Sequence, residues 1–132
     1  MKLARWIFGV AGVYGLVLLV PFYFLEDHIG QDTPPANTHP EFFYGFVGLG
    51  VAWQIAFLCL AVDPVRYRLM MIPSMVEKFS FAIAVAVLVV KNRAPASVAA
   101  FAGVDFVLGI LFVIAYLKTA GLRSEHVARS GA

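Results

Sequence analysis

The chain has 132 residues, of which 61% are hydrophobic and only 14% are charged, and its formal net charge is +2. Soluble domains average about 25% charged residues, so lipid rather than water is the expected solvent. The small net charge, without a basic patch, excludes a nucleic-acid partner. The single cysteine, Cys59, excludes an intramolecular disulfide and a thiolate metal cluster. We expect no cofactor and no bound metal.

Four apolar runs follow one another along the chain, at residues 6–25, 42–62, 69–90 and 96–117. Each is close to the ~20 residues that a helix needs to cross a ~30 Å hydrocarbon core. The runs lack the alternation of barrel strands, and four strands could not close a barrel. The sequence therefore predicts an all-α integral membrane protein. It is a single domain, 1–132, with four antiparallel transmembrane helices, an outer loop at 26–41 and a frayed tail at 118–132.

The first run follows basic residues, as a signal peptide would. It is longer than the ~7–15 residues of a signal h-region and lacks an A-x-A cleavage site, so a retained helix is predicted. In the outer loop, Pro34-Pro35 favours an extended segment. Thr38 and Glu41 have the spacing of a capping box at the start of the second helix. His39 lies between them, and the loop has no recognisable metal-ligand spacing.

Polar side chains fall at similar depths in all four runs, measured from the same end at ~1.5 Å per residue. They are Tyr14 at about 15 Å, Gln54 and Glu77 at about 12 Å, Lys78 at about 13.5 Å and Asp105 at about 18 Å. A lone charge near the bilayer centre costs at least about 2.5–3.5 kcal/mol. We therefore expect a polar layer in which Lys78 reaches across to pair with Asp105.

Glu77 has two interpretations. In the first it is buried in the polar layer of the third helix. In the second, Ser74 and Glu77 form a capping box, so that Glu77 lies near the headgroups and Lys78 snorkels to water. The polar layer itself has two interpretations as well, because paired charges either hold helices together or form a working site.

Lysines and arginines outside the runs divide unevenly between the two sides of the predicted bundle. The side of the termini has seven, namely Lys2, Arg5, Arg66, Arg68, Lys118, Arg123 and Arg129, whereas the other side has only Lys91 and Arg93. By the positive-inside rule, both termini are cytoplasmic.

Three stretches carry a resemblance to known families: "HPEFFYGFVGLGVAWQ", "DPVRYR" and "VEKFSF". In them the chain resembles small uncharacterised bacterial membrane proteins with four helices, broadly DoxX-like, which implies the bacterial inner membrane. It is also similar, more faintly, to the EXPERA-type bundle of sterol isomerases, whose acidic residues surround a lipid-binding cavity. The enzymes of that group need an intramembrane histidine, and none of the four runs contains one.

Three functional hypotheses follow. The first is a non-enzymatic membrane protein that binds a lipid-like ligand or a partner membrane protein near the polar layer. The second is a small proton-coupled transporter or channel that works as a homodimer, in which Glu77 or Asp105 titrates. The third is a membrane enzyme acting on a lipid, for which the sequence offers the least support. Membrane lipids are the surrounding partners in all three.

The uneven distribution of bases gives the first testable prediction. In a variant whose Cys59 is replaced, a cysteine introduced into loop 26–40 should react with a membrane-impermeant thiol reagent in intact cells. Labelling of a cysteine in the 118–132 tail instead would reverse the orientation.

Overall fold

The computed structural model describes residues 1–32 and 36–130, with side chains as far as residue 121. All of the regular structure in this part is helical. In chain order the elements are α1 (Lys2–Leu19), the 3₁₀ helix η1 (Val20–Phe24), α2 (Glu26–Asp32), α3 (Pro40–Val62), the 3₁₀ helix η2 (Arg68–Met70), α4 (Met71–Val90) and α5 (Ala96–Ser130). Four long apolar helices pack antiparallel, so the predicted fold class is confirmed.

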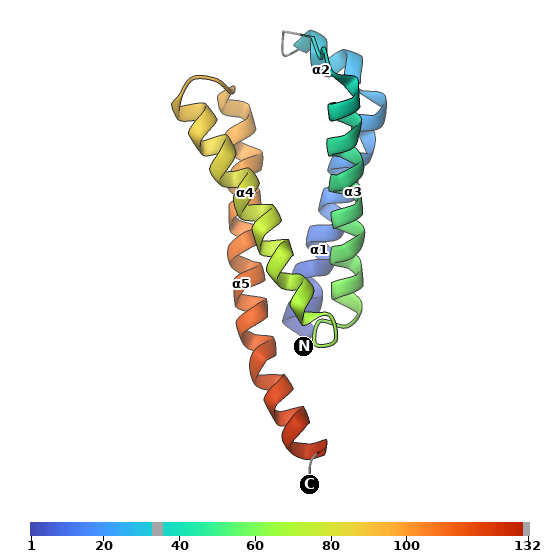
Figure 1. The fold of residues 1–132 in the computed structure, drawn as a ribbon, viewed down its shortest axis with the longest axis vertical. Helices are drawn as coiled ribbons and strands as arrows, with labels where there is room; N and C mark the ends of the chain where they lie inside the picture. Colours follow the sequence, from blue (N-terminus) through green and yellow to red (C-terminus); the bar gives the residue numbers. More distant parts are fainter. Residues whose placement is uncertain (33–35, 131–132) are drawn as a thin grey trace.

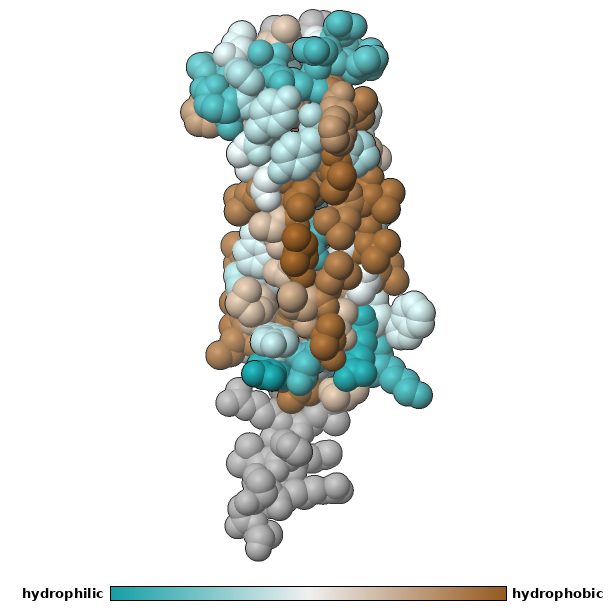
Figure 2. Space-filling view, turned by 90° about the vertical axis from the view of Figure 1, so that its right-hand side faces the viewer, coloured by the Kyte–Doolittle hydropathy of each residue, from teal (hydrophilic) through white to brown (hydrophobic). Residues whose placement is uncertain are grey.

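Four segments are long and apolar enough to cross a membrane: Lys2–Phe24, Pro40–Val62, Arg68–Val90 and Ala96–Gly121. They overlap the four predicted runs. An apolar band covers the middle of the molecule, and hydrophilic residues gather at its two ends (Figure 2). Both termini lie at the same end (Figure 1). This arrangement is that of a multi-pass membrane protein.

The four helices form two hairpins, in which α1 packs on α3 and α4 packs on α5. The hairpins meet in the half of the molecule next to the N-terminus and diverge toward the other end (Figure 1). The buried core lies in the half where they meet, and consists of Ala4, Ile7, Phe8, Ala11, Phe57, Leu60, Met71, Phe112 and Ala115. Contact between the hairpins therefore depends on one end of the bundle.

Small residues bring α1 and α3 close together. A Cβ on Gly12 would lie 2.9 Å from the backbone oxygen of Gln54 and 2.8 Å from Cδ2 of Leu58. A Cβ on Gly15 would overlap the side chain of Gln54. Glycine lets membrane helices approach at backbone distance, so packing within the hairpin accounts for these positions of α1.

A second link ties the turn before α4 to the far end of α5. Nε and Nη2 of Arg68 donate hydrogen bonds to the carbonyl oxygen of Tyr116, at 3.3 and 3.2 Å. The guanidinium carbon also lies 3.7 Å from the centroid of the Tyr116 ring. Arg68 thereby closes the α4–α5 hairpin at the end where the bases gather.

The outer loop differs from the prediction in two ways. Residues Glu26–Asp32 form the short helix α2, because acidic residues in a first turn interact favourably with the free N–H groups there. The predicted capping box is also wrong. His39 is the N-cap of α3, no side chain caps this end, and Glu41 is therefore one position too early to complete the box. The Pro34-Pro35 segment lies outside the described residues.

The frayed tail is also a wrong prediction, because α5 continues from the apolar run through the polar residues to Ser130. Extending an existing helix adds a hydrogen bond for each residue fixed, whereas starting a new one is costly. A polar composition alone therefore did not predict the end of this helix.

The close approach of α1 and α3 gives a prediction of stability. Gly12→Ala should lower the free energy of unfolding by about 1–3 kcal/mol, because the new methyl group meets the backbone of α3 and forces the helices apart. Thermal unfolding in detergent measures the effect. Gly45→Ala is the matched control, since a Cβ at Gly45 meets nothing within 4 Å. Equal stabilities of the two variants would contradict the packing argument.

Candidate functional site

An ionic cluster lies between α4 and α5. Nζ of Lys78 is 3.0 Å from Oδ1 of Asp105, which is the predicted pair. Nζ is also 3.5 Å from Oε1 and 3.3 Å from Oε2 of Glu77. One ammonium group is therefore shared by two carboxylates. When all three groups are ionised, the cluster has one negative charge in excess.

The helical repeat of α4 directs Lys78 into the bundle. The buried residues of this helix are Met71, Ser74, Lys78, Ala82 and Val85, a spacing of three or four that forms one face. The Lys78 side chain is 6% exposed and that of Asp105 is 16% exposed, whereas Glu77, one residue round the helix, is 23% exposed. Lys78 is therefore the inner member, and Glu77 lies at the edge of the cluster.

The alternative in which Ser74 and Glu77 cap a helix is wrong. The hydroxyl of Ser74 donates a 2.6 Å hydrogen bond to the carbonyl oxygen of Met70, one turn earlier in the chain. Helix α4 already begins at Met71, so Glu77 lies in its second turn and not at its N-terminus. Lys78 does not snorkel out of the bundle, since its ammonium group is turned toward α5.

Phe57 lies next to the cluster at the centre of the bundle. Its ring centroid is 5.4 Å from Nζ of Lys78 on α4, 6.1 Å from the ring of Phe8 on α1 and 5.0 Å from the ring of Phe112 on α5. A cation over an aromatic face is attracted by the ring quadrupole. Sequence reasoning missed Phe57, because it is one of 12 phenylalanines in an apolar chain and has no distinguishing local pattern.

Gln54 and Tyr14 are not part of the ionic cluster, so the polar layer of five predicted residues reduces to three. Nε2 of Gln54 donates a 3.1 Å hydrogen bond to the carbonyl oxygen of Gly50 in its own helix, and its side chain lies against Gly15 of α1. Within the described residues, Oε1 of Gln54 is buried and has no hydrogen-bond partner. Tyr14 is 37% exposed on α1. Similar depth did not bring these residues into the cluster: Gln54 shares the buried face of α3 with Phe57, but its side chain is turned toward α1.

The candidates of the outer loop stay at the surface. Nδ1 of His39 is 3.2 Å from Oε1 of Glu41, and both side chains are well exposed. The backbone N–H of His39 donates to Oδ1 of Asn37 at 3.2 Å. Thr38 is exposed. Across residues 1–32 and 36–121, His, Cys, Asp and Glu side chains form no group of three that could hold a metal ion.

The chain matches no protein-family model, no curated protein and no solved structure in the three comparisons made. The cluster offers carboxylate oxygens that accept hydrogen bonds and one ammonium that is already engaged. Such a site suits a polar group that donates hydrogen bonds.

The cluster predicts that the loss of stability depends on which of its charged residues is replaced. Lys78→Met leaves two carboxylates without their ammonium, whereas Asp105→Leu leaves Lys78 paired with Glu77. Breaking a buried pair on one side costs about 3–5 kcal/mol in soluble proteins. We expect Lys78→Met to be the more destabilising variant, and the double variant to recover part of its loss. Thermal unfolding in nanodiscs, as a double-mutant cycle, measures the coupling.

The control for this cycle is Lys91→Met, which removes a lysine that is exposed at the end of α4. It should leave stability nearly unchanged, because solvated charges contribute little. Purely additive effects of Lys78→Met and Asp105→Leu would refute the coupling between the two residues.

Proposed function

We propose that this multi-pass membrane protein is non-enzymatic and holds a lipid-like ligand where its two hairpins diverge. The observation that carries the proposal is a stripe on α5. This stripe is buried where the hairpins meet and becomes partly exposed in the half where they separate. The same stripe contains the acidic residue of the ionic cluster.

The stripe consists of Phe101, Asp105, Leu108 and Phe112, whose spacing of four, three and four residues places them on one face of a helix. Phe112 is fully buried against Phe8 of the other hairpin, with ring centroids 4.3 Å apart. Phe101, three turns away, is 46% exposed. This face is therefore covered at Phe112, held by Lys78 of α4 at Asp105, and partly open at Phe101.

An amphipathic ligand matches the order of groups along this stripe. Its apolar part would cover Phe101 and the neighbouring Val104, which is 41% exposed. Its polar part would reach Asp105 and Glu77, which share a single ammonium. An ionised carboxylate accepts hydrogen bonds and cannot donate them. A ligand headgroup that donates, such as an amine or a hydroxyl, is therefore favoured over an acid.

The setting of this function is part of the proposal. The resemblance and the seven-to-two count of bases favour the bacterial inner membrane with both termini in the cytoplasm. A homodimer or a partner membrane protein covering the same stripe is the competing occupant. A proton-coupled transporter is the second candidate, and the excess carboxylate of the cluster favours it, because a proton would balance the charge.

Photolabelling tests the ligand. The protein in nanodiscs is irradiated with a long-chain amine that has a diazirine in its chain, and labelled peptides are identified by mass spectrometry. We expect labels on residues 101–108 of α5, and at least about tenfold less labelling with Asp105→Asn, because losing a charged hydrogen bond of ~1.5–3 kcal/mol lowers affinity by a factor of about 10 to 100.

The chain-matched fatty acid and the Lys91→Met variant are the controls. The acid should label α5 weakly, and Lys91→Met should label like the parent protein. Equal labelling by amine and acid, or labels spread evenly over all lipid-facing helices, would refute a specific ligand. Delivery of the amine into sealed liposomes, driven by a pH gradient and lost in Glu77→Gln, would favour the transporter instead.

A further inference from the structure

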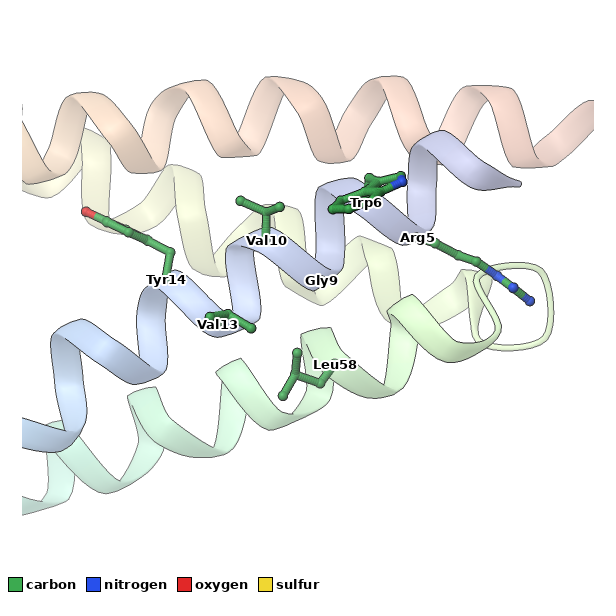
Figure 3. Close-up of a pocket in the computed structure, with 7 residues that line it drawn as sticks. All are labelled: Arg5, Trp6, Gly9, Val10, Val13, Tyr14 and Leu58. Carbon is green, nitrogen blue, oxygen red and sulfur yellow. The ribbon is translucent and has the colours of Figure 1, made fainter.

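A groove of about 600 Å³ lies on the outer side of α1, away from the ionic cluster. It is lined by Arg5, Trp6, Gly9, Val10, Val13 and Tyr14 of α1 and by Leu58 of α3. Trp6, Val10 and Tyr14 rise on one side of it, and Val13 and Leu58 lie between the two helices (Figure 3). Neither the stripe on α5 nor the polar cluster contributes to it.

The residues that line the groove match the parts of a lipid, with a charged group at one end and apolar side chains along the rest. Arg5, the one charged residue among those that line it, is at the end near the N-terminus, and its side chain extends toward the turn after α3 (Figure 3). Trp6 follows and is 72% exposed, as expected for an indole at the membrane interface. Beyond it the wall is made of valine and leucine side chains as far as Tyr14.

The length of the groove fits one leaflet. From Arg5 to Tyr14 the helix rises by about 13 Å at ~1.5 Å per residue. Half of a ~30 Å hydrocarbon core is about 15 Å. An acyl chain that enters beside Arg5 would therefore lie along the groove to near the middle of the bilayer, with its headgroup beside the guanidinium.

We propose that this groove binds an anionic phospholipid from the leaflet on the side of the N-terminus. A guanidinium group binds phosphate through two parallel hydrogen bonds. Lys2 and Arg66 add positive charge at the same end of the molecule, where the carboxylate of Asp63 accepts a hydrogen bond from the backbone N–H of Arg66. No carboxylate lines the groove among the described residues. The charge at this end selects an anionic headgroup, and Gly9 leaves room for the chain because a Cβ there meets only Cβ of Ala61, at 3.7 Å.

Fluorescence quenching tests the proposal, because the chain has two tryptophans and one of them lines the groove. Trp53→Phe leaves Trp6 as the reporter. The variant is reconstituted in phosphatidylcholine vesicles that contain a small fraction of phospholipid with brominated chains, either phosphatidylglycerol or phosphatidylcholine. We expect phosphatidylglycerol to quench Trp6 with about fivefold higher apparent affinity, the factor that one base near an anionic surface supplies.

Two substitutions test the contributions of the lipid headgroup and of the acyl chain separately. Arg5→Gln should remove the headgroup preference, and Arg66→Gln, at the same end but outside the groove, should keep most of it. Gly9→Leu fills the groove and should weaken quenching by both lipids. Its control is Gly103→Leu, because a Cβ at Gly103 meets nothing within 4 Å. If Gly9→Leu fails to fold by circular dichroism, the pair of arginine variants decides the question alone.

Three results would overturn the proposal. Equal quenching by the two lipids in the parent protein would show ordinary annular contact. Equal loss of preference in Arg5→Gln and Arg66→Gln would show a diffuse field rather than a site. Protection of Trp6 from both lipids that disappears on dilution into excess lipid would show that a second copy of the chain covers the groove.

Discussion

One ammonium and two carboxylates lie in apolar surroundings, and the rest of the structure depends on keeping them paired there. Lys78 satisfies this constraint by pairing across to Asp105 and back to Glu77, at 3.0 and 3.3 Å. Charges at membrane depth are costly unless they pair inside the protein. The pair therefore determines which faces of α4 and α5 meet, and Phe57, beneath the ammonium, joins this hairpin to the other. Polar pairing and aromatic packing act at the same level of the bundle.

The two hairpins are held together by different interactions, which follow from their side chains. Glycines bring α1 and α3 to backbone contact, so this hairpin is held by close packing. The α4–α5 hairpin is held by an ion pair and by the hydrogen bonds of Arg68. Among the described residues, the buried core that joins the hairpins lies near the N-terminal end. A molecule built in this way has one firm end and one end at which apolar faces are left to the lipid.

Hydropathy and helix length predicted most of the fold, because the need to satisfy backbone hydrogen bonds in lipid leaves few alternatives. Depth along the helices also predicted the pair between Lys78 and Asp105. Depth did not predict that Gln54 faces Gly15 or that Tyr14 faces outward, because rotation about the helix axis is set by packing. The ends of the elements were less predictable still, as the capping box at Thr38 and the length of α5 show, since local spacing competes there with the continuation of a neighbouring helix.

The order of the charged residues along the chain has a consequence for biogenesis. Lys78 and Glu77 leave the ribosome before Asp105, so α4 reaches the insertion machinery while its ammonium lacks its partner on α5. Glu77 is then the only partner that Lys78 has on its own helix, and each charge at the centre of a segment disfavours transfer into lipid by about 2.5–3.5 kcal/mol on insertion scales. The first hairpin has no such obstacle, because no charged residue lies in the middle of α1 or α3. Membrane entry is therefore expected in two stages, with α4 retained at the translocon until α5 arrives and the two leave it together.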